Sequence, residues 1–390
     1  MTRLSAVAVT THDSKIPRGF GIRTHYMVAA LSRRFDPFCV VGPLHHSRRV
    51  MMRGRLKHRY HESRGEIYRL SRDRRAVRAF GRQVDADLSG MHPDVVISPT
   101  STGSSPLAYA AKTGVRVLWT DLTFHNYVTE TSRSGAKLAR SSLRDGFDNE
   151  RRMLRSVDIA CFASTWAATA CREHYADCID PNRIHVVPFG ANLPDIPTAN
   201  VVREMIASRP NGCCVITFIG FDWERKGGAL VLAAAKILRS RGMQVEVNIV
   251  GVEPPVEVPE YVHVLGRLGQ SGDKASPKIS SVLASSHFLM VPSRAEAFGH
   301  VYAEAAAFGV PSIATAVGGV PTAVVDRETG FLLDLDADGA DYADTVERAW
   351  ASEQEYASLA VRARNHFNSR LDWDIGAATV ESLCLSEIGE

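Results

Sequence analysis

A chain of 390 residues and 42.7 kDa is too long for one ordinary hydrophobic core and predicts two or three domains. Hydrophobic residues make up 45% and charged residues 23%, which excludes disordered, collagen-like and coiled-coil chains. The net charge of +3 divides unevenly, because residues 1–195 carry 30 Lys and Arg against 18 Asp and Glu, whereas residues 196–390 carry 16 against 25.

Short apolar runs alternate with helix-like stretches along the whole chain. Predicted strands of a first series cover 4–10, 37–42, 94–98, 115–120, 157–162 and 184–188. A second series covers 213–219, 245–250, 262–265, 288–291, 311–314 and 330–333. Predicted helices include 21–34, 140–155, 227–241, 301–308 and 374–388. The strand runs are continuously apolar, which is typical of parallel strands that helices bury on both faces.

The strand–helix pattern runs twice, with a break at residues 189–200 (FGANLPDIPTAN), where Gly, Asn and two prolines interrupt it. We therefore expect an α/β chain with two Rossmann-like, doubly wound parallel sheets that face each other across a cleft. The first domain is predicted at 1–195, completed by a C-terminal helix at 374–390, and the second at 196–373. Ligands of such sheets bind at the carboxyl ends of the strands.

Several motifs do not support the function that they suggest at first sight. The stretch from Asp334 to Gly339 (DLDADG) begins like a calcium loop, but position twelve is Thr345 and not the required Glu. We interpret it as the acidic start of a helix. The pairs His45–His46 and His58–His61 lack supporting ligands, so we expect no metal site. No complete dinucleotide fingerprint and no P-loop occur, which disfavours hydride transfer and ATP hydrolysis.

The most informative stretch is residues 291–319 (VPSRAEAFGHVYAEAAAFGVPSIATAVGG). A buried strand is followed by a short loop with Glu296, then by a helix that begins near Gly299 and carries Glu304. A helix N-terminus attracts phosphate or sugar oxygens, and carboxylates pair with the vicinal hydroxyls of a ribose or a hexose. We therefore expect both glutamates to face one ligand.

A second element, residues 220–228 (GFDWERKGG), follows the first strand of the second series and opens a helix. Arg225 and Lys226 place two charges and free amides where a diphosphate could bind without a metal ion.

Together these elements resemble the retaining GT-B glycosyltransferases of family 4, the glycosyl transferases group 1, over essentially the whole chain. The E-x7-E motif of the family corresponds to Glu296 and Glu304, and its Arg–Lys pair to Arg225 and Lys226. The resemblance implies that the cations bind the donor diphosphate, that Glu304 binds the ribose, and that Glu296 binds the transferred sugar. Further donor contacts are implied at the amides of Phe298, Gly299, His300 and Val301, and beside the base at Arg267 and Leu268.

The first domain supplies candidates at the ends of its strands. Gly21 begins a helix that could approach the donor phosphates. Asp121 and His125 follow another strand, and members of the family often carry a histidine there, near the transferred sugar. Retention of configuration needs no protein base, because the leaving phosphate can take the proton of the acceptor. We therefore expect His125 to position the sugar.

The resemblance implies a metal-independent enzyme with a nucleoside-diphosphate sugar as donor substrate, no further cofactor, and a glycolipid or surface-polysaccharide precursor as acceptor. A sugar-nucleotide epimerase of the same fold, or a non-catalytic protein that binds sugars or polyanions, stay open as alternatives. Seven cysteines without a CxxC pair and the lack of a signal-peptide pattern predict a cytoplasmic protein.

Residues 47–82 contain 13 basic and three acidic side chains, which favours an anionic acceptor or an anionic membrane surface. The alternative is a solvated, arginine-rich face. Since the arginines fall on every side of a helical projection, we expect peripheral, reversible contact and no long amphipathic anchor. Nucleic acid is not expected as a partner.

Overall fold

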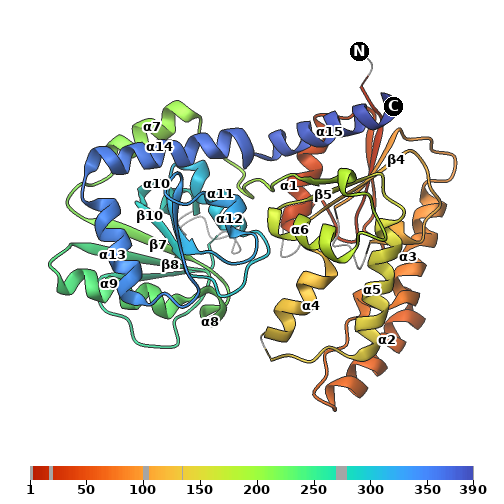
Figure 1. The fold of residues 1–390 in the computed structure, drawn as a ribbon, viewed down its shortest axis with the longest axis horizontal. Coiled ribbons are helices and arrows are strands. Elements are labelled where there is room, and N and C mark those ends of the chain that lie inside the picture. Colours follow the sequence, from red (N-terminus) through yellow and green to blue (C-terminus); the bar gives the residue numbers. More distant parts are fainter. Residues whose placement is uncertain (1–2, 17–20, 100–104, 134, 269–278, 390) are drawn as a thin grey trace. The chain divides into compact units, whose positions relative to one another are not determined.

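The computed structural model describes residues 3–389 except 17–20, 100–104, 134 and 269–278. The chain forms two compact units, each built around one parallel sheet (Figure 1). The first unit comprises Met1–Pro188 and Trp373–Glu390, and the second comprises Phe189–Asp372. None of the helices in the described part of the chain combines the length and apolarity that a bilayer crossing needs.

The sheet of the first unit has six parallel strands in the order β2-β1-β3-β4-β5-β6. Every residue of β1, β3 and β5 is buried, as expected for strands that helices cover on both faces. The strands are β1 Ala6–Val9, β2 Phe38–Val41, β3 Val95–Ser98, β4 Val115–Thr120, β5 Ile159–Phe162 and β6 Ile184–Val186.

Seven α-helices and three 3-10 helices surround this sheet in the described residues. The α-helices are α1 Gly21–Ser32, α2 Arg48–Glu62, α3 Arg74–Asp87, α4 Phe124–Arg133, α5 Arg140–Leu154, α6 Thr165–His174 and α15 Trp373–Gly389. The 3-10 helices are η1 Leu70–Arg72, η3 Pro106–Ala108 and η4 Pro181–Arg183. The C-terminal α15 packs on this unit, because Trp373 meets the buried Trp119 ring at 5.6 Å and Asp374 pairs with Arg33 at 2.6 Å.

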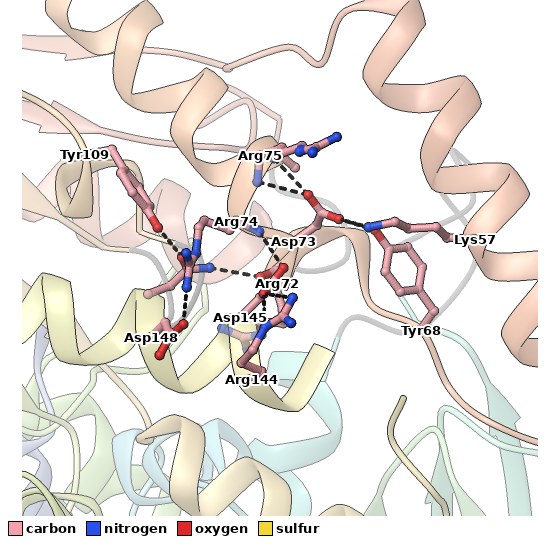
Figure 2. Close-up of polar contacts among 12 residues, drawn as sticks. Lys57, Tyr68, Arg72, Asp73, Arg74, Arg75, Tyr109, Arg144, Asp145 and Asp148 are labelled. Carbon is pink, nitrogen blue, oxygen red and sulfur yellow. Dashed lines mark hydrogen bonds and ion pairs between the residues drawn. The ribbon is translucent and has the colours of Figure 1, made fainter. Parts of the chain in front are cut away.

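The arginine-rich segment folds into α2 and α3. The N-cap side chain of α2 accepts one backbone N–H group, and that of α3 accepts two. Ser47 caps α2, and Asp73 caps α3 by accepting the backbone N–H groups of Arg75 and Ala76 (Figure 2). Asp73 also accepts bonds from Lys57 Nζ at 2.6 Å and the Tyr68 hydroxyl at 2.8 Å. Burial alone would raise the pKa of Asp73, but these hydrogen bonds hold this pKa below its ordinary value.

The sheet of the second unit also has six parallel strands, in the order β12-β11-β10-β7-β8-β9. The strands are β7 Cys214–Ile219, β8 Val245–Val250, β9 Val262–Gly266, β10 Phe288–Val291, β11 Ser312–Thr315 and β12 Gly330–Leu333. The twelve predicted strands are thus confirmed, with ends that differ by at most two residues. Two Rossmann-like sheets, the predicted fold class, are confirmed with them.

Eight α-helices belong to the second unit in the described residues. They are α7 Ala199–Ser208, α8 Trp223–Lys226, α9 Gly228–Ser240, α10 Ile279–Ser285, α11 His300–Ala307, α12 Val320–Ala323, α13 Gly339–Trp350 and α14 Glu353–Arg370. The calcium-like motif is a capping box at α13, because Asp338 accepts the N–H groups of Ala340 and Asp341 while the Asp341 carboxylate accepts the N–H of Asp338. The interpretation as an acidic helix start is confirmed.

The strand order fixes where a ligand can enter the second unit. From β7 the chain moves outward through β8 and β9, and from β10 it moves outward in the other direction through β11 and β12. The loops that follow the neighbouring strands β7 and β10 therefore lead to opposite faces of the sheet and leave a crevice at their carboxyl ends. Both motif stretches of this unit begin at that position.

Candidate functional site

Two cations and one carboxylate meet at the carboxyl ends of β7 and β10. Lys226 Nζ forms an ion pair with Glu296 Oε2, and Arg225 Nη1 lies 3.8 Å from the same oxygen. The Arg225 guanidinium also donates to the Ala295 carbonyl at 3.0 Å. The side chains of Lys226 and Glu296 are only 9% and 13% exposed, so this ion pair is largely desolvated.

Local backbone geometry sets the position of Lys226. Asp222 caps the short helix α8 by accepting the Arg225 N–H at 3.1 Å. Gly227 ends the helix with φ of 74°, and a Cβ there would lie 2.2 Å from the Pro292 carbonyl oxygen. Only glycine fits this close approach, which brings the end of α8 against the loop after β10.

The loop with Glu296 is held by a second glycine. Gly318 has φ of 53°, and a Cβ there would lie 1.9 Å from the Glu296 carbonyl oxygen. The N–H of Gly319 donates to the same oxygen at 3.1 Å. The Gly318–Gly319 pair therefore supports the backbone of Glu296 from the neighbouring loop, which explains why the pair accompanies the glutamates in sequence.

Glu304 lies inside α11 and is 8% exposed. Burial raises the pKa of Glu304 to about 7, against the opposing effects of a backbone hydrogen bond from Asn192 and of the Lys226 charge. Asn192 is itself 7% exposed, and its Oδ1 has no hydrogen-bond partner among the described residues. A buried carboxylate beside a free amide oxygen offers acceptors for the hydroxyls of a sugar.

The raised pKa of Glu304 predicts how stability depends on pH. Because the folded protein holds this proton up to about pH 7 and the unfolded chain only to about 4.5, wild type should lose stability relative to Glu304→Gln as the pH rises through this window. We expect the difference between the two proteins to change by roughly 1–3 kcal/mol. Urea denaturation of both proteins at pH 5, 6, 7 and 8 measures this change. A difference that stays constant with pH would contradict the assignment.

The remaining predicted residues of the second unit lie around this crevice. His300 and Phe298 contact Phe189, with ring centroids at 5.4 Å and 5.6 Å, and His300 Nδ1 is 3.2 Å from the Gly190 carbonyl. Val301 is half-buried in the first turn of α11. After β9, the exposed Arg267 lies over the Phe221 ring at 5.6 Å, and Leu268 is half-buried. Phe221 is 64% exposed, an apolar surface that suits a nucleobase.

In the first unit, the predicted residues lie at the carboxyl ends of the strands. Gly21 is buried at the start of α1. Asp121 follows β4 and pairs with Arg23 at 2.8 Å, so its carboxylate is already engaged. His125 stacks on His174 at 3.5 Å. Burial and the His174 charge lower the pKa of His125, so it is a neutral hydrogen-bonding group at pH 7.

Sequence reasoning missed three buried polar residues near the predicted ones, Arg72 and Glu150 in the first unit and Asn192 in the second. Glu150 Oε1 accepts the Phe124 N–H at 2.6 Å, at the start of the helix that carries His125. Burial lowers the pKa of Arg72, whereas the charges of Glu150 and Asp121 act to raise this pKa. Arg72 lies in an arginine-rich segment and Asn192 in the predicted linker, so neither stood out from its neighbours. The described residues contain no cluster of three His, Cys, Asp or Glu side chains that could hold a metal ion.

Comparisons with known proteins find similarity to glycosyltransferases. Residues 213–352 match the family described as glycosyl transferases group 1. A D-inositol 3-phosphate glycosyltransferase from Gordonia bronchialis is 32% identical over 211 residues, which cover 50% of this chain and 45% of that protein. A protein of the same name from Corynebacterium diphtheriae is 26% identical, covering 60% and 57%. The chain thus spans about half the length of the curated relatives that it matches.

Solved structures share the fold of this chain over nearly its whole length. A sucrose-phosphate synthase from Thermosynechococcus elongatus superposes with a TM-score of 0.66 at 17% identity, covering 99% of both chains. HepE from Anabaena, solved in complex with UDP and glucose, gives a TM-score of 0.61 at 15% identity over 100% of both chains. Residues 213–352, the larger part of the second unit, therefore belong to the glycosyl transferases group 1, and the chain has the fold of solved glycosyltransferases of the GT-B class.

Proposed function

We propose that this protein is a retaining glycosyltransferase that moves a sugar from a nucleoside-diphosphate sugar to an anionic acceptor, without a metal ion. The observation that carries the proposal is the contact of Lys226 and Arg225 with Glu296 at the carboxyl ends of β7 and β10. A diphosphate placed there meets two cations, which can neutralise its charge in place of a metal. HepE, a structural neighbour, is solved with UDP-glucose.

In this proposal the two glutamates have separate tasks. Glu304, next to Asn192, accepts the ribose hydroxyls, while Glu296 holds the transferred sugar. The N-terminal amides of α11 add donors for the sugar or the phosphate. The leaving phosphate takes the proton of the acceptor on the face from which it departs, so the configuration is retained and no nucleophile of the protein is needed.

The first unit binds the acceptor in this proposal. Its positive charge favours an anionic molecule, such as a phosphorylated sugar alcohol, a glycolipid or a surface-glycan precursor. The relatives from Gordonia and Corynebacterium are named for a phosphorylated inositol, which is an acceptor of this class. His125, as a neutral imidazole, positions the transferred sugar by a hydrogen bond.

Incubation of the protein with a panel of labelled UDP, GDP, ADP and dTDP sugars, without acceptor and with EDTA, tests this function. Slow hydrolysis of one donor to sugar and nucleoside diphosphate is the expected result. Conversion to a second nucleotide sugar would instead identify an epimerase, and no reaction with any donor would favour a non-catalytic binding protein. A requirement for Mg²⁺ or Mn²⁺ would overturn the metal-independent mechanism.

The roles of the glutamates predict two different kinetic defects. Glu304→Gln should weaken binding of the nucleoside diphosphate alone, because the amide replaces one of the two acceptor oxygens that face the ribose. Glu296→Gln should leave that affinity nearly unchanged and lower turnover of the complete donor. Calorimetric titration of both variants with the nucleoside diphosphate separates the two roles. Equal losses of affinity would refute the division while leaving the site in place.

We further propose that α2 brings the first unit to an anionic membrane surface. Met52, Leu56 and Tyr60 recur at intervals of four residues on α2 and are 59–60% exposed. Arg55 and Arg59 are exposed beside this row, while the opposite side packs Gly54 against Leu70. This arrangement differs from the expected scatter of arginines on every side, because packing fixes which side of the helix faces solvent. An apolar row edged by cations suits the interface of an anionic bilayer.

Co-sedimentation with vesicles tests the contact of α2 with lipid. We expect binding to anionic vesicles at 50 mM salt that decreases at 500 mM, since salt shortens the range of the attraction. Arg55→Gln with Arg59→Gln should weaken binding about thirtyfold, because each charge near the surface contributes about 1 kcal/mol. Lys137→Gln with Arg140→Gln, which removes the same charge elsewhere on the first unit, is the control. Equal losses in both pairs, or no binding to anionic vesicles, would refute the role of α2.

A further inference from the structure

A second polar hollow, of about 970 Å³, lies in the first unit at the amino ends of β4, β5 and β6. Lys112, Asp158 and Arg183, which precede these three strands, contribute to its lining. In parallel sheets the amino ends lie on the edge opposite to the carboxyl ends, where Asp121 and His125 are found. The hollow is therefore separate from the site proposed for sugar transfer.

The lining of this hollow is strongly cationic. It contains eight Lys and Arg side chains against two aspartates, and both aspartates are already engaged. Asp148 pairs with Arg74, as Figure 2 shows, and Asp158 pairs with Lys112 at 2.6 Å. Asp177, outside the lining, pairs with Arg151 and Arg155, and Glu387 lies 3.7 Å from Arg183. Among the described residues, no carboxylate oxygen lies within 4.0 Å of the guanidinium groups of the remaining lining arginines Arg78, Arg116 and Arg152. Positive charge is therefore in excess.

Arg116 shows that the excess charge reaches into the protein. This second residue of β4 is 2% exposed, and its Nη atoms donate to the carbonyls of Leu107 and Ala110 at 3.0 Å and 2.9 Å. Its Nε is buried and has no hydrogen-bond partner among the described residues. Burial lowers the pKa of Arg116, and the charge of Asp158 acts in the opposite direction. A buried guanidinium with an unused donor is stabilised by an anion.

Aromatic surface is present beside the charges. The guanidinium of Arg152 lies over the Tyr109 ring at 5.0 Å, and the Tyr109 hydroxyl donates to Asn149 Oδ1 at 2.8 Å. The paired N–H groups of a guanidinium match phosphate oxygens. The volume lies within the range of pockets for small molecules.

We propose that this hollow binds a small anion with several phosphate charges, such as a di- or triphosphate group. A single phosphate would leave part of the excess charge uncompensated. The same chemistry is offered by a soluble nucleoside triphosphate and by the headgroup of a phosphorylated inositol lipid. The proposal does not depend on the activity proposed above, because the residues lie at the sheet edge opposite to Asp121 and His125 and in another unit than Lys226 and Glu296.

Calorimetric titration with inorganic tripolyphosphate, together with hydrogen exchange, tests this site. We expect binding at 50 mM salt, with slower amide exchange in residues 107–118. Arg78→Ala with Arg152→Ala changes two exposed side chains of the hollow and should weaken this binding at least tenfold. Lys137→Ala with Arg140→Ala, at exposed positions outside the hollow, removes the same charge from the same unit and should have little effect. Binding in the crevice of the second unit would be seen separately, as protection near residues 222–227.

Competition then identifies the source of the phosphate groups. Displacement of tripolyphosphate by ATP supports a soluble nucleotide, whereas displacement by vesicles with a phosphorylated inositol lipid, but not by ATP, supports a headgroup. The proposal is overturned if wild type does not bind tripolyphosphate or if protection is confined to the second unit. Equal weakening by the two double variants would overturn it as well, because attraction would then be spread over the whole surface.

Discussion

Arg225→Ala combined with Lys226→Ala should lower the affinity for a nucleoside diphosphate by at least about a hundredfold. Each substitution removes a charge-assisted hydrogen bond to the diphosphate, which contributes roughly 1.5–3 kcal/mol. Each 1.4 kcal/mol corresponds to a tenfold change in affinity. The loss should be large because Lys226 is buried and solvent cannot replace it.

Calorimetric titration with UDP, GDP, ADP and dTDP identifies the base that binds to wild type and then measures the loss in the variant. Arg203→Ala with Lys236→Ala is the matched control, since both side chains are exposed on helices of the same unit. The control separates contact with the diphosphate from the general effect of two lost charges. Unchanged affinity and turnover in the Arg225 and Lys226 variant would show that the diphosphate binds elsewhere.

The sequence is sufficient to predict the two sheets because each strand is a continuous apolar run. β8, β10 and β12 have the predicted ends, and α9 and α11 begin directly after Gly227 and Gly299, whose φ angles are 74° and 85°. The helix α2 escaped prediction, since nearly half of residues 48–62 are charged and the buried residue on α2 is Gly54. The Ser47 cap of this helix is local, but it is one hydrogen bond of 3.4 Å, and the packing of Gly54 against Leu70 is not local in sequence.

The sequence predicts which residues of the candidate site carry chemical groups for binding, but it does not predict which of them contact each other. Lys226 and Glu296 are 70 positions apart, and their contact depends on β7 and β10 being neighbours, which requires the strand order. Asn192 lies farther still in sequence from Glu304, within a segment that the sequence identifies only as a linker. The ion pair of Asp121 with Arg23 is of the same kind, because it joins the start of α1 to the end of β4. Long-range pairing of this kind leaves no periodic signal.

Lys226→Met should destabilise the second unit by about 3–5 kcal/mol, because it leaves the buried Glu296 carboxylate without its main partner. Arg225 lies 3.8 Å from Glu296 Oε2 and is more exposed, so it can compensate only in part. Lys236→Met, at an exposed lysine of the same unit, is the control and should change stability by less than about 0.5 kcal/mol. Urea denaturation of the three proteins measures both effects.

The double variant Lys226→Met with Glu296→Gln decides whether the loss comes from the unpaired charge or from packing. Removing both charges takes away the cost of a buried, unpaired carboxylate, so the double variant should be more stable than Lys226→Met alone. If the double variant is as unstable as the single one, Lys226 stabilises the unit through its aliphatic chain. Recovery of stability without recovery of nucleoside diphosphate binding would indicate two roles for Lys226. It binds the diphosphate, and in the absence of ligand its ion pair with Glu296 holds it in a buried position. A diphosphate then gains the lysine only by competing with Glu296, the residue that we expect to hold the transferred sugar.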